Sequence, residues 1–377
     1  VVVPDARDVA LDAVPAAIGA RLGGYSFGKW GADESADAET PAPKVLTFLS
    51  PKAADAKAAF LKDGEALLAG VTFARDLIST PSNIKTPEWF AAQVQEAFAG
   101  VPGVTVTVLD EQQIAELGMG ALYGTGQGSA RPPRLVAVDY RGGKESDAPI
   151  AFVGKGITFD TGGISIKPND GMWRMRSDMS GAAASAGAVL TLAKRNAKMN
   201  AVAVLALAEN MPDGNAIRPG DVLTSMSGKT IEVLNTDAEG RLILADALAY
   251  AAEQKPGHIV DLATLTGSCM MALGTEIAGI MSNDLKWSER LQATAKQAGE
   301  RLWPLPMDDD FAANLKSNVA DIKNVGANRY GGAILGGKFL EQFVAGVPWA
   351  HLDIAGPAWA DHDSPAKDAG GTGAYVR

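Results

Sequence analysis

The segment that most constrains the fold is residues 201–207, where the sequence AVAVLAL contains no polar side chain. An unbroken apolar run of this length is expected for a β-strand that is buried on both faces of a sheet. Other elements must then cover both faces, and in proteins with parallel sheets these elements are helices. Residues 201–207 therefore indicate the interior of a helix-covered sheet.

Segments typical of strands and of helices alternate through the rest of the chain. The strand-like segments are residues 104–109, 135–140, 150–154, 258–262 and 349–354. The helical patterns are residues 11–22, 53–77, 181–195, 241–253 and 333–344, and a further helix is expected to begin after Thr86, with Pro87 at its first position. Such alternation predicts an α/β protein with a mostly parallel central sheet that is flanked by helices.

Charge and composition argue against several classes of function. The 34 basic and 44 acidic residues give a net charge of −10, which disfavours a nucleic-acid-binding protein. No apolar run reaches membrane-spanning length, and no signal peptide is visible at the first residues. The single cysteine, Cys269, excludes an intramolecular disulfide and favours a reducing compartment. We therefore expect a cytoplasmic protein that does not contact membranes.

The histidine content limits the possible catalytic chemistry. The chain has three histidines, which excludes a histidine-rich zinc site and disfavours nucleophilic schemes that need a histidine base. If the protein binds metal ions, carboxylates must supply the ligands.

A glycine-rich segment, residues 154–168, follows the predicted strand at 150–154. Ligand sites of α/β proteins lie at the carboxyl ends of strands. The segment has neither phosphate-loop nor dinucleotide-binding spacing, and Lys155, Asp160 and Lys167 interrupt its glycines. It suits an ion site, although a structural turn with solvated lysines fits equally well.

Three further segments carry candidate residues. Asp237 and Glu239 are two residues apart, so an extended backbone points both to one side, where a divalent cation could bind. An acidic helix start is the alternative, and Arg241 argues against it because a cation is unfavourable at that end. Asp178 is explained most simply as a helix N-cap. The loop 261–268 could hold a peptide through its backbone, but alone it is better explained as an ordinary turn.

Together, residues 154–168 and the octapeptide 235–242 (NTDAEGRL) resemble the leucyl aminopeptidase (cytosol aminopeptidase) family of dinuclear metallopeptidases. Supporting matches are NMP at 210–212, RPGD at 218–221, MSGKT at 226–230, DLATLTG at 261–267, KS at 316–317, GGAI at 331–334 and WAHLDIAG at 349–356. The resemblance extends from about Arg75 to the last residue. It implies a hydrolase that releases amino-terminal residues, preferentially leucine and other apolar ones, by means of a water molecule activated by two metal ions.

The resemblance also implies the metal ligands. One ion would be bound more loosely by Asp160, Asp237 and Glu239, and the other more tightly by Lys155, Asp160, Asp178 and Glu239. Asp160 and Glu239 would bridge the two ions, and Lys155 would bind as a neutral amine. Manganese or zinc is expected first, with magnesium or cobalt as alternatives, because carboxylate sites select weakly among divalent metals.

Other residues take their expected roles from the same resemblance. Lys167 would stabilise the oxyanion of the tetrahedral intermediate, and Arg241 would hold a bicarbonate that acts as general base. The backbone of 264–267, which includes Leu265, would bind the substrate main chain. The pocket for the first side chain would be lined by Met175, Thr264 and Gly267.

The family pattern further implies a domain organisation and an assembly. Residues 1–50 would be the remnant of an amino-terminal α/β domain, 51–79 a linker helix, and 80–377 the catalytic domain. The partners would be peptides with a free amino terminus, and a homohexamer is expected. The shortened amino-terminal domain leaves in doubt the DNA-binding side role of some bacterial members.

Two other functions compete with an aminopeptidase. A different two-metal hydrolase, such as a phosphatase, also uses carboxylate clusters, but the lysine ligand and the complete octapeptide argue against it. A non-enzymatic DNA-binding accessory protein is disfavoured by the net charge of −10.

Overall fold

The computed structural model describes residues 13–28, 52–363 and 369–377. Most of the predicted amino-terminal remnant, including its polar loop at 31–43, lies outside the described residues. Among the helices of the described part, none combines the length and the apolar content needed to cross a membrane.

The described residues form a large mixed sheet with the strand order β1-β2-β4-β3-β7-β11-β8-β9. Its strands are β1 (Val104–Leu109), β2 (Arg134–Arg141), β3 (Ile150–Asp160), β4 (Asn200–Asn210), β7 (His258–Ala263), β8 (Ala278–Ser282), β9 (Leu302–Pro304) and β11 (Trp349–Asp353). The four central strands, β4, β3, β7 and β11, are parallel, whereas β2 and β8 join them antiparallel. Smaller sheets are formed by β5 (Val222–Thr224), β6 (Thr230–Glu232) and β10 (Ile322–Lys323), and by β12 (Trp359–Ala360) and β13 (Gly370–Gly371).

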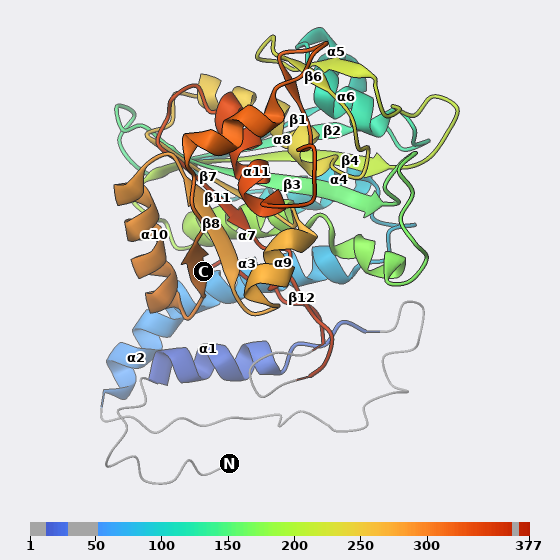
Figure 1. Cartoon of the computed structure of the whole chain (residues 1–377). Helices are drawn as coiled ribbons and strands as arrows, with labels where there is room; N and C mark the ends of the chain where they lie inside the picture. Colours follow the sequence, from blue (N-terminus) through green and yellow to red (C-terminus); the bar gives the residue numbers. More distant parts are fainter. Residues whose placement is uncertain (1–12, 29–51, 364–368) are drawn as a thin grey trace.

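Helices cover both faces of the large sheet (Figure 1). One face carries α3 (Glu65–Ser79), α4 (Pro87–Phe98) and α7 (Ser180–Lys194), with α1 (Ala13–Gly23) and α2 (Ala53–Ala59) outside them. The other face carries α5 (Glu111–Glu116), α6 (Gly120–Gly126), α8 (Gly240–Glu253) and α11 (Gly332–Leu340). The remaining helical segments are α9 (Gly267–Leu273), α10 (Leu285–Ala298), the π-turn η1 (Phe60–Gly64) and the 3₁₀ segments η2 (Met172–Ser177), η3 (Asp309–Leu315) and η4 (Glu341–Phe343).

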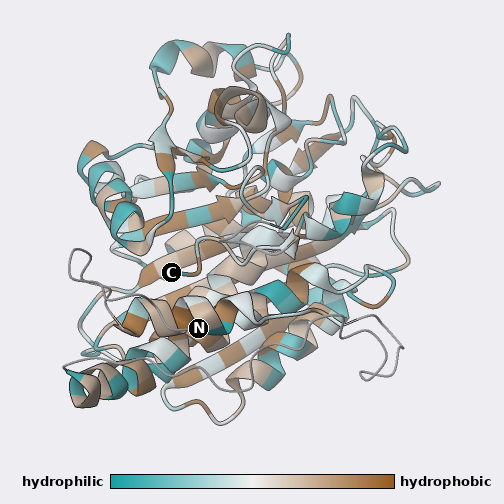
Figure 2. Ribbon diagram, turned by 90° about the horizontal axis from the view of Figure 1, so that it is seen from below, coloured by the Kyte–Doolittle hydropathy of each residue, from teal (hydrophilic) through white to brown (hydrophobic). Residues whose placement is uncertain are grey.

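The central strands and their covering helices are the most apolar part of the molecule, and hydrophilic residues are more frequent in the outer helices and loops (Figure 2). Strand β4, which contains the run at 201–207, is buried almost throughout. Its side chains alternate between two hydrophobic clusters, one on each face of the sheet. The predicted α/β fold with a mostly parallel, helix-flanked sheet is confirmed.

The structure differs from the predicted elements at three places, one of which is the helical pattern at 333–344, where α11 ends at Leu340 and the 3₁₀ segment η4 follows. The predicted strand at 150–154 continues to Asp160, so Lys155 and Asp160 lie on β3 and not in a loop. They pair there with Ala206 and Asn210 of β4. A buried lysine inside a strand is unusual. Lys155 is tolerated there because it forms ion pairs with Asp178 and Glu239. The helical pattern at 53–77 is divided into α2, η1 and α3.

Glycines allow α7 to pack unusually close to the sheet. A Cβ atom on Gly181, in the first turn of α7, would lie 1.9 Å from the carbonyl oxygen of Leu262 in β7. On the other side of this contact, a Cβ on Gly154 of β3 would lie 2.4 Å from Cα of Ala182. These approaches place the amino-terminal end of α7 directly against the strands that carry the candidate site.

We predict that Gly181→Ala destabilises the protein, because the obstructing atom belongs to the backbone and cannot rotate away. Overpacking of this kind typically costs about 1–3 kcal/mol of the free energy of unfolding, which chemical denaturation measures. The matched control is Gly257→Ala, whose new Cβ meets only the Cβ of Ala148 at 3.6 Å. Equal stabilities of the two variants would contradict the close-packing argument.

Candidate active site

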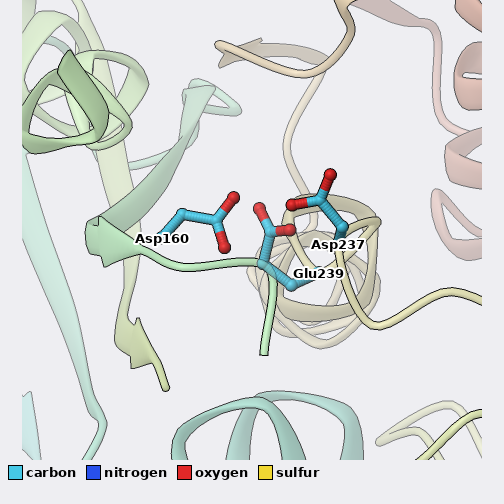
Figure 3. Close-up of side chains that lie close together, drawn as sticks. All are labelled: Asp160, Asp237 and Glu239. Atoms are coloured by element: carbon cyan, nitrogen blue, oxygen red, sulfur yellow. The ribbon is translucent and has the colours of Figure 1, made fainter. Parts of the chain in front are cut away.

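Three carboxylates converge at the carboxyl end of β3. Asp160 is the last residue of that strand, and Asp237 and Glu239 lie in the turn that leads into α8. One oxygen from each side chain lies within 4.8 Å of the others (Figure 3). The pairing of strands and the placement of α8 thus bring Asp160 close to Asp237 and Glu239, which lie 77 and 79 positions further along the chain.

Lys155 lies at the centre of a second set of contacts. Its Nζ is 2.9 Å from Oδ1 of Asp178 and 2.8 Å from Oε1 of Glu239, and it donates a hydrogen bond to the carbonyl of Thr264. The hydroxyl of Thr264 donates in turn to Oδ1 of Asp178. Residues from β3, from the start of α7, from the start of α8 and from the loop after β7 therefore meet at one buried ammonium.

Gly240 makes room for this lysine. A Cβ atom at Gly240 would lie 2.6–2.7 Å from Cδ, Cε and Nζ of Lys155. The glycine of the octapeptide thus allows the first turn of α8 to lie against the lysine side chain. A solvated surface lysine, which the sequence left open as an alternative, is excluded because Lys155 is only 3% exposed.

Lys167 reaches the first cluster from the segment that follows β3. Its Nζ is 2.8 Å from Oδ2 of Asp160 and also forms an ion pair with Asp237. By itself burial lowers the pKa of Lys167, but the nearby carboxylates of Asp160 and Glu239 outweigh it and raise the pKa above its ordinary value. Lys167 is therefore a cation at neutral pH.

The two clusters together hold more negative than positive charge. Four carboxylates face two lysines. Burial raises the pKa of Glu239 to about 8, and repulsion from the Asp160 carboxylate acts in the same direction. Burial likewise raises the pKa of Asp178 to about 6 against the attraction of Lys155. Oδ2 of Asp178 and Oε2 of Glu239 are buried and find no hydrogen-bond partner in the part of the chain that the structure describes. A divalent cation would neutralise the surplus negative charge and would bind the carboxylate oxygens that lack a partner.

The helix-cap alternative left open for Asp178 is wrong, whereas an acidic residue does stand at the start of α8. Asp178 does not cap α7, because the N-cap is Met179 and the Asp178 carboxylate is engaged by Lys155 and Thr264. Glu239 is the N-cap residue of α8, but its side chain makes no capping hydrogen bond.

Asn210, at the end of β4, orients Asp160 and was not identified as a site residue from the sequence. Its side-chain amide donates to Oδ1 of Asp160 at 2.8 Å and to the carbonyl of Thr236. The backbone N–H of Gly162 donates to the same oxygen of Asp160 at 2.8 Å. Only Oδ2 of Asp160 is left to face the lysine, which fixes the orientation of this carboxylate.

Arg241 is buried in the first turn of α8. Its Nη1 donates to the carbonyl of Asn324 at 2.8 Å, whereas its Nε is buried and has no partner. Burial lowers the pKa of Arg241 to about 10, although the carboxylates of Glu239 and Asp353 act in the opposite direction. The guanidinium thus keeps its charge at neutral pH and retains an unused donor.

The loop 264–267 is held by Asp353, a buried residue of β11 that the sequence analysis missed. Oδ1 of Asp353 accepts the backbone N–H groups of Leu265 and Thr266, and Oδ2 accepts the Thr266 hydroxyl at 2.7 Å. Thr266 also caps α9, whose first residue is Gly267. Apart from its chain neighbours and its own helix, no described residue has an atom within 4 Å of a Cβ placed on Gly267, so this glycine faces open space.

Met175 lies in η2, and a third missed residue, Lys85, anchors that segment. Lys85 is fully buried, and its Nζ donates to the carbonyls of Leu77, Ile78 and Arg176 at 2.9, 3.0 and 2.6 Å. Three acceptors satisfy the three hydrogens of one ammonium group. Lys85 therefore ties η2 to the end of α3.

Comparison with known proteins relates the chain to aminopeptidases. Residues 72–377 match the profile described as "Cytosol aminopeptidase family, catalytic domain". A "Probable cytosol aminopeptidase" of Rhizobium etli (strain CIAT 652) is 48% identical over the whole chain, which spans 75% of that relative. One from Caulobacter vibrioides is 50% identical over 97% of the chain and 74% of the relative.

A solved structure is also similar. It is described as "Bottromycin maturation enzyme BotP in complex with Mn", with a TM-score of 0.85 and 38% sequence identity. The similarity covers 96% of this chain and 76% of that one. At this identity the likeness extends to the sequence as well as to the fold.

We predict that Lys85→Met destabilises the protein by at least about 3 kcal/mol, because three buried carbonyls lose their donor and each costs roughly 1–3 kcal/mol. Chemical denaturation measures the free energy of unfolding. The matched control is Lys338→Met, since Lys338 is also buried but pairs with Asp309 and Glu341, which water can reach. A loss in the control equal to that in Lys85→Met would contradict the role given to the three carbonyls.

Proposed function

The chain belongs to the cytosol aminopeptidase family, and we propose that it acts as a metal-dependent aminopeptidase that releases leucine and other apolar residues from the amino terminus of peptides. The observation that carries this proposal is the surplus of carboxylates at the carboxyl end of β3 and the amino-terminal end of α8. Some of their oxygens are buried and lack a partner among the described residues. An aminopeptidase is a hydrolase, and the relatives are named probable cytosol aminopeptidases.

The carboxylates would hold two divalent ions per chain. Asp160, Asp237 and Glu239 would hold the looser ion, and Lys155, Asp160, Asp178 and Glu239 the tighter one. Manganese or zinc is proposed first, and magnesium or cobalt would also suit oxygen ligands. The manganese named for the similar solved structure supports this choice.

When bound, two such ions supply Lewis acidity that activates water and polarises the scissile carbonyl. The protein's own groups would do the rest. Lys167, held as a cation by its carboxylate neighbours, would stabilise the negative oxygen that develops in the transition state. Arg241 would hold a bicarbonate through its free Nε, and this anion would accept the proton of the attacking water.

Substrate recognition would use both the backbone and apolar side chains. The main chain of 264–267, held by Asp353, would bind the peptide backbone, and Leu265 belongs to this stretch. Met175, Thr264 and Gly267 would line the pocket of the first side chain. Asp178 would assist in binding the free α-amine, so a peptide with a blocked amino terminus should not be a substrate.

We further propose a cytoplasmic location, which the word cytosol in the relatives' names supports. A homohexamer is proposed from the family pattern, with peptides as the partners and no role in membrane or nucleic-acid binding. The division into a remnant at 1–50, a linker helix at 51–79 and a catalytic domain at 80–377 remains a prediction.

The function is tested by metal dependence. Purified protein should hydrolyse leucinamide, lose this activity on chelation and regain it when manganese or zinc is added. Phosphate monoesters should not be hydrolysed, which separates the proposal from a two-metal phosphatase. Full activity in protein shown to be metal-free would refute it.

Lys167→Ala should lower kcat for leucinamide about 10²–10³-fold, since loss of one transition-state donor typically has that effect. Its metal content, measured by mass spectrometry, should stay at two ions per chain. Loss of metal in this variant would mean that Lys167 holds the site together and does not act on the transition state.

Lys155→Met should reduce bound metal from two ions towards one and abolish most activity. Binding as an amine requires Lys155 to release its proton, so occupancy of the tighter site should fall as pH falls. Lys155→Arg should not restore activity, because a guanidinium does not deprotonate. The control Lys194→Met changes an exposed lysine of α7 and should keep both ions. Two ions and normal turnover in Lys155→Met would remove Lys155 from the ligand set.

A further inference from the structure

A cavity of about 460 Å³ is lined by residues of β3, β4 and η2, elements that also carry residues of the candidate active site, and it has no role in the function proposed above. Charged and apolar side chains share its wall. Six of the lining residues are Arg131, Phe159, Trp173, Arg176, Glu209 and Met211.

The cavity shares elements with the candidate active site. Phe159 immediately precedes Asp160 in β3, and Arg176 lies two residues before Asp178, at the end of η2. Glu209 belongs to β4, the strand paired with β3. A ligand in the cavity would therefore contact β3, β4 and η2, the elements that carry or immediately precede Asp160, Asn210 and Asp178.

Arg176 is an unpaired cation in this cavity. Its Cζ lies 5.4 Å from the ring centre of Trp173 and 5.0 Å from that of Trp359, so aromatic rings flank the guanidinium. Its Nε is buried without a partner, and within the described residues the guanidinium makes no hydrogen bond or ion pair. Burial lowers the pKa of Arg176. A rigid, planar guanidinium with free donors is suited to bind a carboxylate through two hydrogen bonds.

The other lining groups define the ligand more closely. Arg131 adds a second positive charge, while Glu209 adds one negative charge and accepts a hydrogen bond from Ser129. The net charge of +1 favours a singly charged anion over phosphate. Phe159 and Met211 supply apolar surface, so the anion should be attached to an apolar group.

We propose that this cavity is a subsite for the α-carboxylate of an apolar amino acid residue. The carboxylate can come from the carboxyl terminus of a short peptide substrate or from a released amino acid. In both cases Arg176 binds the carboxylate and the apolar wall contacts the side chain. Deciding between a peptide carboxyl terminus and a released amino acid rests on the proposed aminopeptidase function. The existence of the subsite does not depend on that function.

Calorimetric titration of the metal-loaded protein with N-acetyl-leucine tests the subsite. This probe has the carboxylate and the apolar side chain but no free α-amine, so it lacks the group expected to bind at the metals. Binding should weaken at least about tenfold in Arg176→Gln, the usual effect of losing a charged hydrogen bond. The control Arg174→Gln removes a neighbouring arginine of η2 that pairs with Asp361, and it should retain the affinity of the unaltered protein. Absence of binding, equal affinity in Arg176→Gln, or equal loss in both variants would overturn the proposal.

Peptide hydrolysis then identifies the source of the carboxylate. The KM values of leucyl-glycyl-glycine and of its carboxy-terminal amide are compared in the unaltered protein and in Arg176→Gln. A rise of about tenfold in the ratio of acid to amide KM assigns the subsite to the substrate's carboxyl terminus. An unchanged ratio, together with loss of N-acetyl-leucine binding, assigns it to a released amino acid. If leucinamide is not hydrolysed at all, the proposed function fails, and the titration still decides whether the subsite exists.

Discussion

The contacts of Lys155 hold the candidate site together. A single ammonium joins Asp178, Glu239 and the carbonyl of Thr264, which belong to three segments that are distant in sequence. An ion buried to this extent is stable only while its partners remain in place, because an unpaired buried charge costs several kcal/mol. The positions of α7, of α8 and of the loop after β7 are therefore linked through one side chain.

This arrangement depends on very close packing. Gly154 and Gly181 allow α7 to approach β3 and β7, and Gly240 allows the first turn of α8 to lie against the lysine. Larger residues at these points would separate the helices from the sheet and the carboxylates from Lys155. The glycines thus contribute to the electrostatics of the site although they carry no charge.

The sign of the local charge distinguishes the carboxylate site at the end of β3 from the cavity that contains Arg176. The site at the end of β3 has a surplus of carboxylates and partnerless oxygens, which favours cations. The neighbouring cavity has a surplus of guanidinium groups, which favours an anion. A zwitterionic amino acid or a short peptide carries both complementary charges.

The sequence alone predicted the sheet and its helical cover, and its resemblance to the aminopeptidase family pointed to the three carboxylates that cluster at the end of β3. Those predictions rest on local patterns: the apolar run at 201–207, the alternation of elements, and the short motifs at 154–168 and 235–242. Local patterns did not identify β8 and β9, which have five and three residues, or the extension of β3 through a buried lysine. Nor did they reveal Lys85, Asn210 and Asp353 as supports of the site. Each of these residues makes at least one hydrogen bond to a partner that is distant in sequence, 91, 50 and 88 positions away respectively, and such bonds form only when the folded sheet and helices bring those segments together.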